Sequence, residues 1–255
     1  MGAALPGDAL QAMIAVKVHE LPDGQRIAYR FAPGGGPTLV FLPGYMSDMA
    51  GSKATAVFEW AQANNRACLL FDYSGCGQSS GDFAAGTLSR WRDEALALIA
   101  TQCPGPVVLV GSSMGGWLML LIALAIPAHV TALVGIAAAP DFTDWGYSTQ
   151  QKAQLAAGET VLEANPYCPE PSPTYPAFWR DGEAQRMLDS KIALTCPVRL
   201  LHGQADADVP WQTALRLAQA VRSADVQVTL VKDGDHRLSR TSDITLLLQM
   251  IAAVG

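Results

Sequence analysis

The stretch that decides the fold lies mid-chain and reads VVLVGSSMGGW, residues 107–117. Its first four residues are apolar and mostly β-branched, which is typical of a buried strand. A glycine–x–serine–x–glycine pattern follows, formed by Gly111, Ser113 and Gly115, and the apolar run 117–126 indicates a helix. Strand, glycine-flanked serine and helix in this order are typical of a nucleophile elbow, a sharp turn that exposes a serine hydroxyl. The flanking glycines are expected because a Cβ there would collide with the neighbouring strand or helix.

Strands and helices alternate along the rest of the chain. Residues 17–21 and 26–31 are predicted to form an antiparallel hairpin. Further strands are predicted at 38–42, 67–71, 130–138, 198–201 and 226–231, and helices at 50–64, 88–101, 211–222 and 244–252. This order predicts an α/β fold: one doubly wound, mostly parallel, eight-stranded sheet with an antiparallel edge.

Residues 141–190 interrupt the alternation after the sixth predicted strand. This segment is rich in aromatic residues and holds five of the chain's 16 prolines. Because a structureless loop of about 50 residues is improbable in a compact domain, we expect an insertion that forms a lid over the substrate. The alternative is a mobile, poorly packed insertion with no substrate role. The aromatic residues favour the lid.

Composition limits the class of protein. With 255 residues, half of them hydrophobic and 16% charged, the chain suffices for a single domain spanning residues 1–255. The net charge is −6 and the basic residues are scattered, so nucleic acid is excluded as an expected partner. The longest apolar run, residues 117–126, is about half a membrane span, which predicts no transmembrane segment.

Cysteine usage and the first residues bear on location. The five cysteines, including Cys168, are widely spaced and odd in number, which predicts neither a disulfide framework nor a metal site. The first sixteen residues hold no lysine or arginine for a leader peptide. We therefore expect a cytoplasmic protein without a metal or other cofactor.

A serine nucleophile requires a base, and the base requires an orienting acid. In this strand order the partners should follow the serine as Asp or Glu and then His. Of the four histidines, His236 lies in the loop directly after the last strand, where it can reach the elbow. His19 and His129 lie elsewhere, and His202 closes a strand beside a glycine, which favours a turn role. His236 is therefore the predicted base.

The acid should come from the loop after the strand at 198–201, which offers two aspartates. Asp206 is the better candidate, because Asp208 falls near the start of the next helix, where capping explains it. Asp141, at the end of the preceding strand, is a weaker third choice. The acid would orient the His236 ring and stabilise its protonated form.

An oxyanion hole completes the predicted site. One donor should be the backbone N–H of Met114, the residue after the nucleophile, and the second that of Tyr45, in the turn after the strand at 38–42. This mechanism predicts that Tyr45 acts through its amide more than through its ring. Two rival nucleophiles are set aside: Ser112 is expected to be buried and hydrogen-bonded, and Cys76 to be structural.

These motifs resemble the α/β-hydrolase superfamily. The similarity includes the turn at 42–44, the D-x-x-G-x-G-x-S turn at 72–79 and the H-G-x-x-D-x-x-V-P segment at 202–210. Segments 43–47, 71–75, 111–119 and 235–237 are similar to a narrower group of α/β-hydrolase-domain proteins, which includes a mitochondrial palmitoyl-protein thioesterase that also cleaves acyl glucuronides. The resemblance implies nucleophile, acid and base at Ser113, Asp206 and His236. The insertion matches poorly, and no mitochondrial targeting segment is visible.

Together these observations predict a serine hydrolase that cleaves ester or thioester bonds through an acyl-enzyme. Substrates are expected to be small molecules or acyl chains, a palmitoylated protein among them. The alternatives are a carboxylesterase for small or aryl acyl groups including acyl glucuronides, a carbon–carbon bond hydrolase or perhydrolase, and a non-catalytic binding module.

Overall fold

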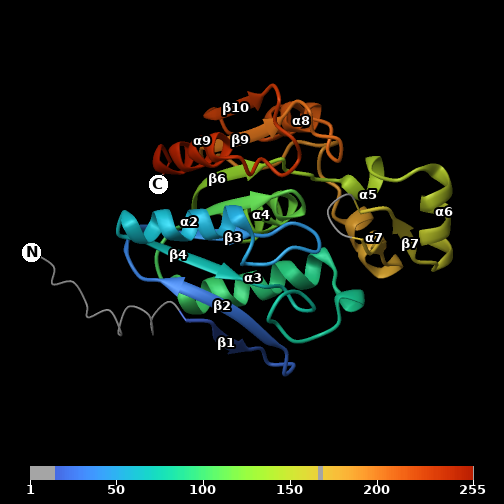
Figure 1. Ribbon diagram of the computed structural model, residues 1–255, viewed down its shortest axis with the longest axis horizontal. Helices are drawn as coiled ribbons and strands as arrows, with labels where there is room; N and C mark the ends of the chain where they lie inside the picture. The colour runs from blue at the N-terminus through green and yellow to red at the C-terminus, as the bar shows by residue number, and fades with distance from the viewer. Residues whose placement is uncertain (1–14, 166–168, 255) are drawn as a thin grey trace, which may run out of the picture.

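An eight-stranded sheet forms the centre of the structure, a computed structural model that describes residues 15–165 and 169–254 (Figure 1). The strands are β1 (Lys17–Glu20), β2 (Arg26–Ala32), β3 (Gly35–Leu42), β4 (Arg66–Phe71), β5 (Val107–Ser112), β6 (Val130–Ile136), β9 (Val198–Gly203) and β10 (Val226–Val231). Their order is β1-β2-β4-β3-β5-β6-β9-β10, with β2 antiparallel to both neighbours and the pairs from β4 to β10 parallel. The predicted sheet, with its antiparallel edge, is confirmed. The N-terminal residues 1–14 and Cys168 lie outside the described residues.

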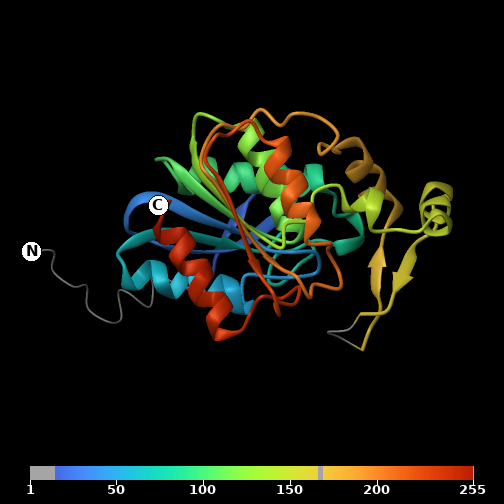
Figure 2. The same cartoon turned by 90° about the horizontal axis from the view of Figure 1, so that it is seen from above.

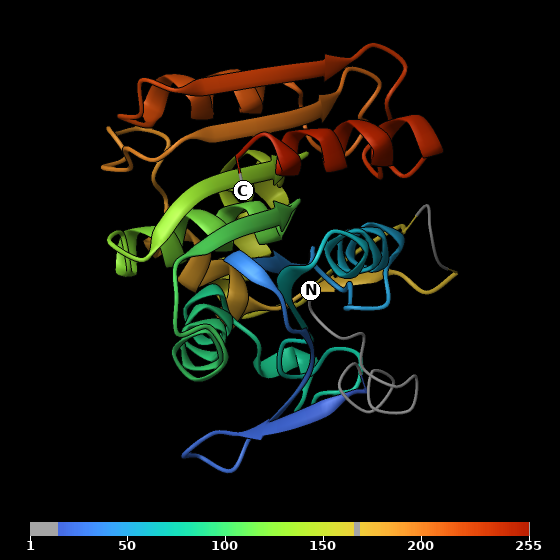
Figure 3. The same cartoon turned by 90° about the vertical axis from the view of Figure 1, so that its left-hand side faces the viewer.

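Helices cover both faces of the sheet (Figures 2 and 3). They are α2 (Ser52–Ala63), α3 (Leu88–Gln102), α4 (Met114–Ala125), α8 (Gln212–Ala220) and α9 (Thr241–Ala252), and a short 3₁₀ turn, η1 (Phe83–Ala85), precedes α3. Along β5, Val108 and Val110 pack with α2 and α9, while Val107 and Leu109 pack with α3, α4 and α8. Alternate residues of a strand point to opposite faces, so this apolar run fills two cores at once.

The chain leaves the sheet after β6 and forms an insertion before β9. Its elements are α5 (Phe142–Trp145), α6 (Thr149–Ala157), β7 (Val161–Glu163), β8 (Ser172–Thr174) and α7 (Pro176–Ala184). β7 and β8 pair antiparallel in a separate two-stranded sheet. The insertion lies at one end of the molecule, beyond the carboxyl ends of the central strands (Figures 1 and 2). Its elements were not predicted from the sequence because each is nine residues or shorter, too short to show a helical or strand periodicity.

A single carboxylate joins the two ends of the insertion. Asp141 is buried, with a left-handed backbone (φ 59°), and its oxygens accept hydrogen bonds from the amides of Met187 and Leu188. Burial raises the pKa of this carboxyl, while the two amides counteract the rise. Asp141 therefore fastens the insertion where it leaves and rejoins the sheet. This explains its presence without a catalytic role.

The most apolar helix belongs to the core. Residues from Met114 to Ala123 of α4 are all buried, between the sheet and α3. Within residues 15–165 and 169–254, no helix combines the length and the apolar character that crossing a membrane requires.

Candidate active site

Ser113 lies in a strained turn between β5 and α4. Its backbone has φ 54° and ψ −120°, a conformation that residues other than glycine rarely adopt. The turn is held because the Ser113 N–H donates to Ile136 O (2.9 Å) and its carbonyl accepts from Ala139 N (3.1 Å). A Cβ on Gly111 would lie 2.4 Å from the Gly115 carbonyl oxygen, and one on Gly115 would lie 2.0 Å from that of Leu42. The expected steric need for both glycines is confirmed.

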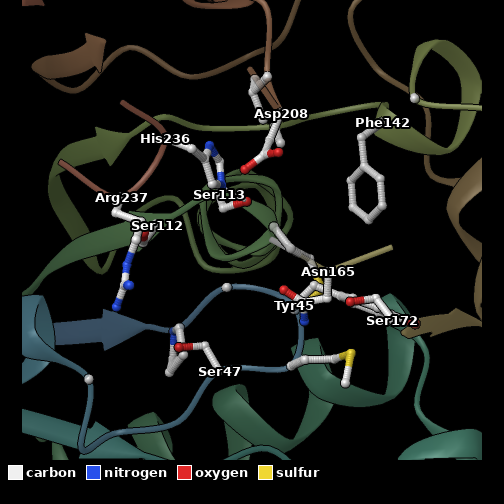
Figure 4. A pocket seen from close by; sticks show the side chains of 18 of the residues that line it. Tyr45, Ser47, Ser112, Ser113, Phe142, Asn165, Ser172, Asp208, His236 and Arg237 are labelled. Carbon is white, nitrogen blue, oxygen red and sulfur yellow. Dashed lines mark hydrogen bonds between the residues drawn. The ribbon is translucent and has the colours of Figure 1, made fainter. Parts of the chain in front are cut away.

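Two loops bring the other predicted residues to this serine. β9, β10 and β5 are parallel, so the loops after β9 and β10 lie at the same edge of the sheet as the elbow. His236 Nε2 lies 3.1 Å from Ser113 Oγ, and His236 Nδ1 lies 2.9 Å from Asp206 Oδ2. Three side chains far apart in the sequence thus form one continuous chain of hydrogen bonds (Figure 4 shows Ser113 and His236).

Both oxygens of Asp206 accept hydrogen bonds, although the side chain is fully buried. Oδ1 accepts from the amides of Asp208 (2.9 Å) and Val209 (2.8 Å), while Oδ2 faces His236 and lies 3.2 Å from His202 Nε2. Burial alone would raise the pKa of this carboxyl, but the bonds from His202 and His236 outweigh it and hold the pKa well below its usual range. Asp206 therefore stays ionised and can orient His236 without taking its proton.

His202 is the residue that the sequence analysis misjudged. It was expected to serve a turn, yet it is fully buried at the end of β9, in contact with Asp206. The signal that could have found it is the spacing His202–x–x–x–Asp206 across a strand end. With this spacing the loop after β9 can fold back and place the Asp206 carboxylate beside the His202 imidazole.

Asp208 also departs from its expected role. α8 begins at Gln212, its N-cap residue is Trp211, and no side chain caps it, so the interpretation of Asp208 as a helix cap is wrong. The helix starts later than predicted, which leaves Asp208 in the preceding loop. Its side chain instead points toward Ser113 and His236 (Figure 4) and lines the cavity beside them.

The described residues include one cluster whose donor atoms are close enough for a metal ion: Asp206, Asp208 and His236, within 4.8 Å of one another. Both oxygens of Asp206 and both nitrogens of His236 already have hydrogen-bond partners. The cluster is therefore better described as part of the serine site than as a metal centre.

The turn after β3 packs directly against Ser113. A Cβ on Gly44 would lie 3.4 Å from Ser113 Cβ, and both Tyr45 and Met114 line the cavity around the serine. Met114 is the first residue of α4 and Tyr45 follows Gly44, the positions expected of oxyanion-hole amides. Their role as donors stays a prediction.

The ring of Tyr45 has structural contacts of its own. Its hydroxyl donates to the carbonyl of Pro173 in the insertion (2.8 Å), and burial raises the pKa of this phenol. The ring packs against four other aromatic rings, those of Phe83, Trp91, Phe142 and Phe178. Tyr45 therefore links the turn after β3 to the insertion.

The rival nucleophiles are poorly placed. Ser112 is buried, as expected, and lines the same cavity, but His236 Nε2 faces the Ser113 hydroxyl oxygen at 3.1 Å. Burial and the nearby carboxylates of Asp72 and Glu94 raise the pKa of the Cys76 thiol to about 12, so it is not a thiolate at neutral pH.

A cavity of about 740 Å³ opens above Ser113. Three insertion aromatics line it, namely Phe142, Trp145 and Tyr147, together with polar insertion residues Glu163, Asn165, Ser172 and Thr174. Phe178 packs in the core instead, and the Trp179 indole donates to Thr143 O (3.0 Å). About half of the predicted aromatic lining thus anchors the insertion, and the wall facing the serine is mixed in polarity.

Two basic residues also line this cavity, Lys53 at the start of α2 and Arg237 next to His236 in the chain. The Lys53 ammonium donates to the backbone carbonyl of Arg237. Desolvation and the Arg237 charge lower the pKa of Lys53 to about 8. This pair ties α2 to the loop that carries His236.

The elbow, the three converging side chains and the sheet define an α/β hydrolase. The chain belongs to the alpha/beta hydrolase family, whose model matches residues 39–245. It is 43% identical to the mouse "Palmitoyl-protein thioesterase ABHD10, mitochondrial" over 235 residues, which are 90% of this chain and 77% of the relative. Identity to the human protein of that name is 39% over 239 residues, covering 90% and 76% of the two chains.

Solved structures of similar proteins share this fold. Mouse alpha/beta hydrolase domain-containing protein 10 superposes with a TM-score of 0.87 at 37% identity, covering 94% of this chain and 97% of that one. A putative hydrolase from Agrobacterium vitis S4 gives a TM-score of 0.88 at 39% identity, covering 94% and 99%.

The relatives contradict one prediction. The mouse, human, orangutan, rat and cattle proteins are all named mitochondrial, so the expectation of a cytoplasmic protein is not upheld. That expectation depended on cysteine usage and on the absence of lysine and arginine from the first sixteen residues. The packing of the core and the geometry of the site do not depend on the cellular compartment, so they could not have corrected this expectation.

Proposed function

We propose that this protein is a serine hydrolase that transfers an acyl group from a thioester or ester to water, with Ser113, His236 and Asp206 as nucleophile, base and acid. The single observation that carries the proposal is the unbroken contact from Ser113 Oγ through His236 to Asp206, 3.1 Å and 2.9 Å long. Both distances are within hydrogen-bond reach, as a nucleophile and its base require.

The reaction has two halves. Ser113 Oγ attacks the acyl carbonyl while His236 Nε2 takes the hydroxyl proton, and ionised Asp206 stabilises the resulting imidazolium. The amides of Tyr45 and Met114 donate to the oxyanion, each worth about 3 kcal/mol of transition-state stabilisation. Collapse breaks the carbon–sulfur or carbon–oxygen bond, and the leaving group takes the proton from His236. A water deprotonated by His236 then attacks the acyl-enzyme and releases the carboxylic acid together with free Ser113.

An acyl thioester is the preferred substrate class. Support comes from relatives at 39–43% identity that are named palmitoyl-protein thioesterases and that align with about nine-tenths of this chain. The insertion acts as the lid: Phe142, Trp145 and Tyr147 provide apolar surface for an acyl chain beside Ser113. An acylated protein cysteine or a smaller acyl thioester would both present the same carbonyl to the serine.

A second candidate is a carboxylesterase for acyl groups attached to an anionic leaving group, such as an acyl glucuronide. The observation that favours it is the basic pair Lys53 and Arg237 on the cavity wall, opposite the polar insertion residues. A carboxylate on the leaving group could interact with this pair.

Labelling with a fluorophosphonate probe tests the proposed nucleophile. The wild type should react, Ser113→Ala should not, and Ser112→Ala should keep most of the labelling because His236 Nε2 faces the Ser113 hydroxyl. Persistence of labelling in Ser113→Ala, in a variant whose thermal denaturation matches the wild type, would rule out the proposed nucleophile.

A further inference from the structure

His202 has an environment that packing alone does not explain. The side chain has no exposure to solvent. Its Nε2 lies 3.2 Å from Asp206 Oδ2 and 3.1 Å from the carbonyl oxygen of Val209. Its Nδ1 is buried and has no hydrogen-bond partner among the described residues. The imidazole thus makes its polar contacts through one nitrogen, and both contacts are in the loop that carries Asp206.

These contacts fix the protonation state of the ring. Two oxygens face Nε2, so this nitrogen must carry a hydrogen, because a lone pair there would repel both. A second hydrogen on Nδ1 would be a buried donor without an acceptor, which costs more than an unused lone pair. His202 is therefore neutral, with its hydrogen on Nε2 shared between Asp206 and Val209.

A buried imidazole with one unused nitrogen stabilises a core less than an apolar side chain of the same size. The neighbours of His202 on β9 are apolar and buried, including Leu200 and Leu201. The contribution of His202 therefore comes from the two contacts of its one N–H, with Asp206 and with the Val209 carbonyl. That N–H closes a ring of contacts, because the Val209 amide donates to Asp206 Oδ1 at 2.8 Å while the Val209 carbonyl faces His202.

We infer that His202 is a positioning residue for the acid: it fixes the rotation of the Asp206 carboxylate so that Oδ2 stays on His236 Nδ1. The inference rests on the proposed function, since it assigns a role within the same serine site. By sharing Oδ2 with His236, the His202 N–H also offsets part of the carboxylate charge. The His236 ring therefore gives up its proton to the leaving group more readily than it would beside an unshared carboxylate.

The test compares His202→Met with His202→Gln. Methionine fills the volume but has no donor, whereas the glutamine amide carries N–H groups near the position of Nε2. In His202→Met the titration midpoint of the His236 ring, followed by NMR, should rise, because Asp206 loses a donor that offsets its charge. The kcat of ester hydrolysis should fall about tenfold. His202→Gln should restore both values most of the way toward the wild type.

Other charges near the base stay constant in this comparison. Asp208 faces the His236 ring, and Asp235 and Arg237 adjoin it in the chain. None of them is altered, so a shift in the His236 titration reports on Asp206. His129→Gln serves as the matched control, because His129 Nε2 contacts only the distant carbonyl of Cys103 (3.1 Å) and its loss should leave the titration and kcat unchanged.

An unchanged or lowered midpoint in His202→Met, or an unchanged kcat, would overturn the inference, as would failure of His202→Gln to restore either value. If His202→Met does not fold, His202→Gln and His202→Asn decide between a donor near Nε2 and one near Nδ1, and equal behaviour of the two contradicts the proposed contact. The NMR titration requires no turnover. It therefore reports on His202 even if the labelling experiment removes Ser113 as the nucleophile.

Discussion

At the scale of single residues, the carboxylate of Asp206 is the group whose surroundings are most specific. Four N–H groups face its two oxygens, and its pKa is held well below the usual range by the bonds from His202 and His236 that overcome burial. Asp208 is two residues away and exposed, yet it points to the same serine (Figure 4). The two aspartates therefore form a matched pair for substitution.

Asp206→Asn should reduce kcat about 10³–10⁴-fold, because an amide cannot stabilise the imidazolium and disturbs the tautomer of His236. Asp208→Asn should change kcat less than about tenfold, since His236 Nδ1 already faces Asp206 Oδ2 at 2.9 Å. Steady-state kinetics of both variants on one ester, with denaturation midpoints as a check of folding, measures this. Equal losses in the two variants would mean that the acid has been assigned to the wrong residue.

The sequence could predict that Ser113, Asp206 and His236 come together, because each follows a strand and parallel strands bring such ends to one edge of the sheet. It could not predict His202 in the same way. Whether a histidine at a strand end points into the core or into a turn depends on the register of β9 against β6 and β10, which a single sequence does not specify. The direction of the Asp208 side chain was missed because Asp208 lies in the irregular loop between β9 and α8, where no sequence periodicity indicates which way a side chain points.

At the scale of elements, a cap at the start of α9 ends the loop that carries His236. Asp243 is fully buried in its first turn, and its oxygens accept from the Arg240 backbone N–H (3.2 Å) and from the Arg240 guanidinium (2.8 and 2.9 Å). The guanidinium bonds hold the pKa of Asp243 below its usual value, with burial acting the other way. This cap follows directly after the loop that carries His236.

Asp243→Asn should lower the Tm at pH 7 by a few degrees, since asparagine keeps the backbone cap but loses the ion pair. A lowered folded-state pKa gives stability that is present above the ordinary aspartate pKa of about 3.9 and is lost as the pH falls through and below that value. The difference from wild type should therefore be constant from pH 7 to 5 and shrink below about pH 4. Calorimetry across this range measures it, with the exposed Ser242→Ala as control. A difference that persists undiminished in acid would contradict the role of the charge.

At the scale of the whole molecule, the cavity lies between the sheet edge and the insertion and is lined by residues of both. The alternation of strands and helices made the sheet predictable from sequence, because each apolar run has to fill both cores. The insertion was not predictable beyond its existence. Its aromatic residues divide between the cavity wall, as with Tyr147, and the core, as with Phe178, and composition alone does not separate the two.

Chain length tests the proposed acyl pocket. With p-nitrophenyl esters, kcat/KM should rise from acetate to octanoate, by at most about fourfold for each methylene that becomes buried. The rise should be reduced by Phe142→Ala, which shortens the apolar wall, and retained in the exposed Leu215→Ala control. Activity confined to short acyl groups would favour the carboxylesterase candidate over the thioesterase.

The hydrogen bonds of Asp141 that join the two ends of the insertion have a consequence for engineering this protein. Because the Asp141 carboxylate binds the amides of Met187 and Leu188, the two ends of the insertion lie next to each other. If the insertion forms the proposed acyl pocket, replacing it with the corresponding segment of another hydrolase, with Asp141 retained, should change chain-length preference and leave the contacts among Ser113, His236 and Asp206 in place.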